Sequence, residues 1–429
     1  MTASDVRTLT LREGLPVWTA IAAESFGGPA AQIGVLHRVL VEERQWISDD
    51  AFQRALSFCM LLPGPEAQQL ATYVGWLLHG PWGAIVAGAL FVLPGFIVLL
   101  VLSWLYVVAG DTTLAQGILL GIRPAVVAIL AFALVRMMRR LKKSALRLGI
   151  ALGSFLLLFF GRVPFPIVLG AAAMLGVWWL SDRETRSQPM PRAAAVATLA
   201  AGGIWLAVWL VPLVVVIVTL GSDHVLAQQG RFFAGSALVT FGGAYAVLTY
   251  VAQEAVQRYH WLTPTEMVTG LGFAESTPGP LIQVVQFVAF LGAYRAAEPF
   301  SPLTAGVIAS ILVTWLTFVP SFFFILGLGP FVERVAHNRW LLGALHGVSA
   351  AVLGAMLNLA IWFALHSLFA DVRERTLGVV HVTVPTFASI DWLAFAVVLS
   401  GAVLLLRVTI KPLTLIACAA MIGVLRVML

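Results

Sequence analysis

Long apolar runs follow one another along almost the whole chain, and short polar stretches separate them. A helix needs about 20 apolar residues to cross the hydrocarbon core of a bilayer, and most of these runs approach or exceed that length. Each run is continuous rather than alternating, which excludes a transmembrane β-barrel. The pattern predicts an all-α polytopic membrane protein with about 13 membrane segments. The predicted segments lie near 15–36, 49–80, 81–108, 114–138, 144–160, 163–180, 193–218, 231–252, 264–296, 302–329, 340–369, 390–406 and 411–428.

The second half of the chain repeats the first. Pro63-Gly64-Pro65 returns as Pro278-Gly279-Pro280, a displacement of 278 − 63 = 215 residues. Phe26-Gly27-Gly28 returns as Phe241-Gly242-Gly243 at the same displacement. A displacement that stays constant over such a length indicates an internal duplication.

Beyond the Pro-Gly-Pro element the displacement becomes 320 − 94 = 226, as Pro94 and Pro320 show. Both copies then carry Gly-x-x-x-Gly on the corresponding segment, Gly117/Gly121 and Gly343/Gly347. Small residues at this spacing let two helix backbones approach closely. We interpret these glycines as packing residues.

One apolar run, 193–218, has no counterpart and joins the two copies. An extra crossing between repeats of equal internal count makes the second copy enter the membrane from the opposite side, so we predict inverted repeats related by a pseudo-two-fold axis in the membrane plane. The predicted organisation is a first repeat over 1–185, a linking loop and helix over 186–230, and a second repeat over 231–429. Whether 49–80 crosses as a broken helix or folds back, and on which side the N-terminus lies, stay open.

Composition agrees with this class of protein. The chain is 60% hydrophobic and 11% charged, whereas an ordinary soluble domain has about 25% charged residues. The net charge of +6 comes largely from the basic stretch 136–147, which is typical of a cytoplasmic loop and does not indicate a nucleic-acid partner. Cys59 and Cys418 lie in apolar surroundings, so we predict no disulfide, metal site or cofactor.

The two Pro-Gly-Pro elements are the strongest candidates for a binding site. Proline removes an amide donor and keeps the preceding residue out of the helical conformation, so each element ends one helix and begins another. Backbone groups freed inside a membrane must meet protein or water, and such breaks normally line a cavity. Helix N-termini that converge there would attract an anion. The alternative is that both breaks are only kinks. The predicted substrate-binding residues are Gly64, Pro65, Glu66, Gln68, Gly279, Pro280, Gln283, Gly27, Gly28, Gly242 and Gly243, together with Arg123.

Ionisable groups distinguish the two copies. Glu66 corresponds to Leu281, and Arg123 corresponds to Ser349. A charged residue at the centre of a membrane helix costs about 2.5–3.5 kcal/mol on insertion scales, so it usually faces a polar interior and a partner. Arg123 is therefore an anion ligand, part of a structural ion pair, or a snorkelling residue near a helix end. Glu66 either couples anion binding to its own protonation or only interacts with the helix dipole.

Several motifs extend beyond these elements. They are Phe26-Gly27-Gly28-Pro29, the segment from Leu62 to Ala71, Tyr73-x-Gly75, Gly80-x-x-Gly83, Ala87-Gly88, Leu93-Pro94, Phe241-Gly242-Gly243 and Thr277-Pro278-Gly279-Pro280. A chain with these motifs resembles the chromate ion transporter family in its long form, which has two homologous halves. The second copy departs from the pattern because Leu281 stands where the first has Glu66.

The resemblance implies a secondary transporter that exports chromate from the cytoplasm across the bacterial inner membrane and confers chromate resistance, with sulfate as a structural mimic. Moving one elementary charge through 100 mV is worth about 2.3 kcal/mol, so a divalent anion can leave a negative interior without ATP. Coupling to protons and assembly into a homodimer stay open, and the remaining partner is membrane lipid. A carrier for sulfate, molybdate or another oxyanion is the alternative function. An intramembrane enzyme fits less well because the eight histidines are scattered, and a sensory protein would not need matched helix breaks.

Overall fold

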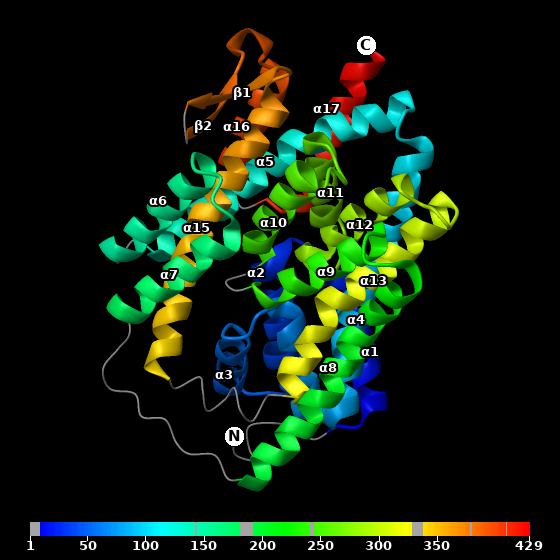
Figure 1. Ribbon diagram of the computed structural model, residues 1–429, viewed down its shortest axis with the longest axis vertical. Coiled ribbons are helices and arrows are strands. Elements are labelled where there is room, and N and C mark those ends of the chain that lie inside the picture. Colours follow the sequence, from blue (N-terminus) through cyan, green and yellow to red (C-terminus); the bar gives the residue numbers. More distant parts are fainter. Residues whose placement is uncertain are drawn as a thin grey trace. The chain divides into compact units, whose positions relative to one another are not determined.

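The computed structural model describes residues 9–141, 144–180, 192–240, 244–327, 338–377, 380–408 and 410–429. These residues are mostly helical (Figure 1), as expected for a polytopic membrane protein. Many large apolar side chains, such as Trp178, Ile204 and Val218, are exposed on the helices. Exposed apolar surface of this extent is typical of helices that face lipid.

Helices of the first repeat are followed by a linking helix and then by those of the second repeat. The first repeat contains α1 (Leu11–Glu24), α2 (Gly28–His37), the π-helix η1 (Arg38–Glu43), α3 (Asp49–Cys59), α4 (Glu66–Ala109), α5 (Thr113–Leu141), α6 (Ala145–Phe159) and α7 (Phe165–Trp179). The linking helix is α8 (Arg192–Leu220). The second repeat contains α9 (Val225–Leu238), α10 (Ala244–Gln253), the π-helix η2 (Glu254–Arg258), α11 (Pro264–Ser276), η3 (Leu281–Gln283), α12 (Val284–Arg295), α13 (Pro302–Phe322), η4 (Phe323–Gly327), α15 (Arg339–Leu368), β1 (Val372–Leu377), β2 (Val380–Pro385), η5 (Phe387–Ser389), α16 (Trp392–Arg407) and α17 (Pro412–Met428).

Within the described ranges, five helices are long and apolar enough to cross a membrane. They are Glu66–Ala109, Thr113–Arg139, Ala200–Leu220, Pro302–Gly327 and Arg339–Leu368, and five shorter apolar helices accompany them. At 1.5 Å per residue the 44 residues of α4 would span about 66 Å, twice the thickness of the hydrocarbon core. The backbone at Gly80 is non-helical, with φ 70° and ψ −162°. α4 is therefore two helices that meet at Gly80-Pro81, where the sequence predicts a boundary.

Other segment predictions need correction. The run 15–36 is divided between α1 and α2, because Gly27 has a left-handed φ of 81° and Pro29 begins the next helix. The run 49–80 is divided between α3 and the first part of α4, at the Pro-Gly-Pro element where the sequence predicts a break. At 11 and 15 residues, these two pieces are each too short to cross the hydrocarbon core alone.

Local details of the first repeat recur in the second at the displacement of 215. The π-helices η1 and η2 occupy related positions. Two residues beyond the end of each lies a residue with positive φ, Gln45 at 52° and His260 at 53°, and a buried tryptophan follows it. The Trp46 N–H donates to the Leu40 carbonyl (2.9 Å), and the Trp261 N–H donates to the Ala255 carbonyl (2.8 Å). The duplication therefore extends to backbone conformation and hydrogen bonding.

The chain divides into two compact units, and each takes segments from both repeats. Unit 1 comprises 1–101, 182–247 and 277–342, and unit 2 comprises 102–181, 248–276 and 343–429. In unit 1, α13 packs against α8, α9 and α12. In unit 2, α5 packs against α11, α16 and α17. The sequence boundaries at 185 and 231 stay predictions, since these units follow spatial contacts rather than ancestry.

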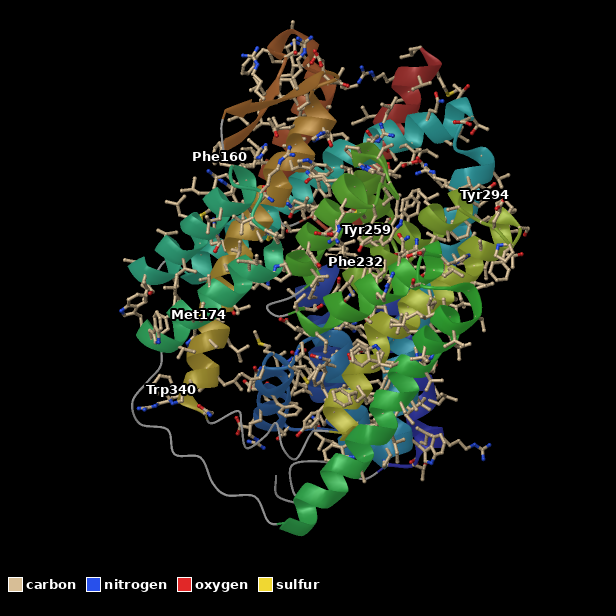
Figure 2. All side chains as sticks on the ribbon, viewed as in Figure 1. Phe160, Met174, Phe232, Tyr259, Tyr294 and Trp340 are labelled. Atoms are coloured by element: carbon tan, nitrogen blue, oxygen red, sulfur yellow. The ribbon has the colours of Figure 1, made fainter. Side chains whose placement is uncertain are left out.

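The second repeat contains a β-hairpin that the prediction of an all-α chain misses. β1 and β2 pair antiparallel, from Val372 opposite Pro385 to Leu377 opposite Val380 (Figure 1). Alternating β-branched residues in 380–384 favour a strand, but the segment is short and lies between two strong apolar runs. The His381 N–H donates to the Phe160 carbonyl at the end of α6 (2.8 Å), and Figure 2 labels Phe160 beside the hairpin.

Candidate functional site

The first Pro-Gly-Pro element lies between α3, which ends at Cys59, and α4, which begins at Glu66. Gly64 has φ 133°, a conformation that residues with a β-carbon rarely adopt. Its N–H donates to the Thr240 carbonyl at the end of the second repeat's α9 segment (2.8 Å). The first turn of α4 follows directly, and its amides have no acceptor within the helix.

The second element lies between α11, which ends at Ser276, and η3, which begins at Leu281. Gly279 has φ 100°, and its N–H donates to the Ser25 carbonyl of the first repeat (2.8 Å). A β-carbon on Gly95 would collide with the Pro278 carbonyl oxygen. Gly95 follows Pro94, so the break of the second repeat packs against the proline region of α4.

These two hydrogen bonds are equivalent under the displacement of 215, because Ser25 corresponds to Thr240 and Gly64 corresponds to Gly279. Each break is thus held by a backbone carbonyl of the other repeat. Reciprocal contacts of this kind arise when two related bodies are joined around a two-fold axis. All four residues belong to unit 1.

The Phe-Gly-Gly motif supplies the segment next to these carbonyls. Gly27 and Gly28 both have positive φ, 81° and 80°, which turns the chain from α1 into α2. Gly28 is buried, and a β-carbon there would lie 3.6 Å from the Tyr245 hydroxyl of the second repeat. The matching Gly242 and Gly243, which were also predicted as site residues, lie outside the described residues.

The matched glutamines are both buried but bind different partners. The Gln68 amide Nε2 donates to the Thr72 hydroxyl (3.4 Å). The Gln283 Nε2 donates to Gln286 Oε1 (2.7 Å) and to the Thr314 hydroxyl (3.2 Å). In each residue Oε1 is buried with no hydrogen-bond partner among the described residues.

Sequence reasoning missed three polar residues at the breaks. Gln69 Nε2 donates to the Pro63 carbonyl (2.7 Å), and Gln32 Nε2 donates to the Gly279 carbonyl. The Ser321 hydroxyl lies 3.4 Å from the place of a Gly64 β-carbon. Ser321 follows Pro320, which is the counterpart of Pro94. A polar residue next to a proline that both copies share could have identified Ser321 from the sequence.

Glu66 is the first residue of α4 and is half-buried. Its carboxylate lies close enough to the buried Cys59 thiol for an electrostatic interaction. Within unit 2, the Arg123 Nε donates to the Thr269 hydroxyl of α11 (3.4 Å). Nearby, the Tyr106 hydroxyl donates to Glu266 Oε1 (3.2 Å), and both groups interact electrostatically with Arg123. Arg123 belongs to unit 2, whereas both breaks belong to unit 1. The expectation that Arg123 faces the same cavity as the breaks therefore stays a prediction.

The Gly-x-x-x-Gly motifs are packing residues, and their contacts are also exchanged between repeats. A β-carbon on Gly121 of α5 would collide with the Ala419 carbonyl of α17, and one on Gly347 of α15 would collide with the Ala172 carbonyl of α7. α5 and α15 are corresponding helices, as are α7 and α17, the last helices of the repeats. Unit 2 therefore repeats the reciprocal pattern of unit 1.

A family model described as chromate transporter matches residues 15–178 and again 227–424. The chain belongs to the chromate transporter family. The two matches lie on either side of α8, in agreement with the duplication. The resemblance drawn from the sequence motifs is thereby confirmed.

Among curated proteins, a chromate transport protein of Cupriavidus metallidurans is 29% identical over 411 residues, which cover 93% of each chain. A chromate transport protein of Pseudomonas aeruginosa is 33% identical over 345 residues, 80% of this chain and 77% of the relative. No solved structure matches the chain. These relatives support a transporter rather than an enzyme.

Proposed function

We propose that this protein is a secondary transporter that exports chromate from the cytoplasm across the bacterial inner membrane and so confers chromate resistance. Membership of the chromate transporter family supports the substrate. The observation that carries a transport mechanism is the reciprocal hydrogen bonding of the breaks, Gly64 to Thr240 and Gly279 to Ser25. Each break is fixed by the other repeat, so a movement of one repeat against the other changes both breaks together.

The proposed repeats are inverted. Exchanged contacts in both units support a two-fold relation, and the single helix α8 (29 residues) between the repeats supports an axis in the membrane plane. In such carriers the substrate binds between the repeats, where discontinuous helices end. Alternating access then arises when the repeats rock about that site.

The proposed substrate site uses the N-terminal ends of the helices that follow the two Pro-Gly-Pro elements. First-turn amides and the positive end of the helix dipole favour an anion. Gly64 and Gly279 allow the backbone itself to approach the ligand, because neither carries a side chain. Arg123 is proposed to add a full positive charge from the first repeat.

Membrane potential supplies the proposed driving force. Each negative charge that leaves the cytoplasm gains about 2.3 kcal/mol per 100 mV. A singly charged anion at this potential reaches a gradient of roughly fiftyfold, since 1.4 kcal/mol is a factor of ten. Export therefore requires no nucleotide, and the chain carries no Gly-x-x-x-x-Gly-Lys-Ser/Thr phosphate-binding motif.

Radiolabelled uptake tests the proposal directly. The purified protein in proteoliposomes, with an imposed potential, should accumulate labelled chromate on the side that corresponds to the outside of the cell. Protein-free liposomes and proteoliposomes with dissipated potential are the controls. If the protein transports sulfate or molybdate but not chromate, its substrate is another oxyanion. If it transports none of the three, the proposed transport function is excluded.

A further inference from the structure

Buried polar atoms with no hydrogen-bond partner among the described residues lie beside Gly64. A β-carbon on Gly64 would lie 2.5 Å from Gln69 Nε2 and 3.4 Å from the Ser321 hydroxyl oxygen. Gln69 and Ser321 are fully buried. Gln69 Oε1 and Ser321 Oγ have no hydrogen-bond partner among the described residues. Buried polar atoms are normally hydrogen-bonded, so these two are candidate groups for binding a polar ligand.

The hydrogen-bond network fixes which end of the Gln69 amide is unpaired. The Pro63 carbonyl can only accept, so the Gln69 group 2.7 Å from it must be the NH₂. Oε1, an acceptor, is therefore the unpaired atom. The same reasoning holds for the preceding Gln68. The Thr72 hydroxyl donates to the Gln68 carbonyl (2.8 Å) and can only accept from the Gln68 side chain. Gln68 Oε1 is likewise an unpaired acceptor on the first turn of α4.

The second break lacks the counterparts of Gln69 and Ser321. Val284 stands where the first repeat has Gln69, at the displacement of 215, and Gly95 stands where the second repeat has Ser321, at the displacement of 226. Amide oxygens with no hydrogen-bond partner among the described residues occur at this break too, on Gln32 and Gln283. The feature specific to the first break is therefore the pair of Gln69 and Ser321.

The charges near the first break determine which ligand it can accept. Glu66 on α4 and the Cys59 thiol on α3 are titratable groups there, and Tyr73 on α4 stacks against Phe58 of α3. α13, which supplies Ser321, has no ionisable side chain. The unpaired amide oxygens can only accept, so they cannot pair with a fully deprotonated dianion, which has no hydrogen-bond donor. A ligand with its own O–H group would instead donate to Gln69 Oε1 and accept from Ser321.

We propose that the first break binds a singly protonated tetrahedral oxyanion, which for this family is hydrogen chromate. The ligand hydroxyl donates to Gln69 Oε1, and the Ser321 hydroxyl and the first-turn amides of α4 donate to its other oxygens. Chromate takes up a proton near neutral pH, whereas sulfate remains a dianion there, so the site discriminates between two ions of similar shape. This inference rests on the proposed transport function and names its substrate form.

The pH dependence of proteoliposome transport tests the ligand's protonation state. Chromate uptake by the wild-type protein at constant total chromate should rise as the pH falls, in proportion to the hydrogen chromate fraction, and sulfate should compete poorly. E66Q should keep this profile, because the titrating proton belongs to the ligand. Chromate transport that does not change with pH, equal competition by sulfate, or loss of the profile in E66Q would each overturn the inference while leaving chromate transport established.

The Ser321 hydroxyl is tested with a matched serine on the same helix. Ser310 is also fully buried in α13, but its hydroxyl donates to the Gly306 carbonyl (2.8 Å). S321A should raise the KM for chromate about tenfold, the loss expected for a hydrogen bond to a charged ligand, with little change in kcat. S310A should leave KM unchanged. Equal KM values for S321A and the wild type would overturn the role of Ser321, and parallel effects of the two variants would reduce it to packing.

Discussion

The Pro-Gly-Pro elements of the two repeats share a backbone arrangement and differ in almost every side chain around it. In both, a glycine with positive φ donates its N–H to a carbonyl of the other repeat at 2.8 Å. Beyond that, Glu66, Gln69 and Ser321 lie at the first break, and their counterparts at the second are Leu281, Val284 and Gly95. The duplicated backbone provides the scaffold, and side chains that differ between the copies distinguish the two breaks.

The difference agrees with the sequence, in which Glu66 of the first copy corresponds to Leu281 of the second. A symmetric carrier needs matched backbone geometry at both breaks, because each must take part in the same movement. It does not need matched ligand groups, since a single substrate binds once per cycle. Divergence is therefore free to give the two breaks different polar groups, such as Gln69 and Ser321 at the first and Gln32 at the second.

The largest expected effects come from the two glycines. Gly64→Ala and Gly279→Ala each place a side chain at a positive φ, a strain of about 1–3 kcal/mol. At Gly64 the new methyl also contacts the Gln69 amide, so Gly64→Ala should lower the thermal unfolding temperature more than Gly279→Ala. Adding Gln69→Ala should recover part of the loss at Gly64. The matched addition of Val284→Ala should not raise the unfolding temperature of Gly279→Ala. Equal and additive losses of stability at the two breaks would show that their glycines are packed alike.

A large loss of transport is expected when Arg123 is changed. Arg123→Gln removes the charge proposed to attract the anion, and we expect at least a tenfold fall in chromate kcat/KM with little loss of folded protein. Thr269→Val is the control, because it removes the hydroxyl that accepts from Arg123 Nε and keeps the charge. If both variants mainly reduce expression, Arg123 is a structural residue of unit 2.

A smaller effect should distinguish the residues that follow the prolines. Glu66→Gln removes a negative charge from the first break, so the KM for chromate should fall by a few-fold, as expected when a hydrated like charge costs about 1 kcal/mol. Leu281→Gln adds no charge, and its KM should stay close to that of the wild type. KM is measured from initial rates in proteoliposomes. An unchanged KM in Glu66→Gln would reduce this carboxylate to a group that stabilises the N-terminus of α4.

The sequence alone predicts the parts of this molecule that depend on local pattern. Apolar runs predict the membrane helices, and a constant displacement predicts the duplication down to the paired residues Gly64 and Gly279. The Pro-Gly-Pro motif marks where helices end, because proline acts on its own neighbours. The family follows from the same motifs.

Long-range pairing is what the sequence leaves out. The Thr240 carbonyl accepts from Gly64, about 176 residues away, and the Ser25 carbonyl accepts from Gly279, about 254 residues away. No local sequence pattern at either carbonyl indicates its partner. Ser321 is one serine in an apolar helix, and only its position opposite Gly64 makes it a candidate ligand. The predicted single run 15–36 fails for a related reason, since hydropathy does not register the left-handed turn at Gly27.

The smallest expected effect concerns the β-hairpin, the element that most separates the second repeat from the first. Asp371 precedes β1 and accepts from the Thr386 hydroxyl (2.8 Å) and from Arg373 (3.1 Å). These contacts, led by the Thr386 hydroxyl, lower the pKa of Asp371.

A carboxylate with a lowered folded-state pKa stabilises the fold above its unfolded pKa, and this contribution is lost as the pH falls through the folded-state value. Amide hydrogen exchange in 372–385 should therefore become faster, after correction for the intrinsic pH dependence of exchange, when wild-type protein is acidified through that range. Asp371→Asn should show the faster corrected exchange at neutral pH and no further change on acidification. Exchange in α5, which has no such carboxylate pair, serves as the internal reference. A variant whose hairpin exchanges like the wild type at neutral pH would mean that strand pairing alone holds the inserted hairpin in place.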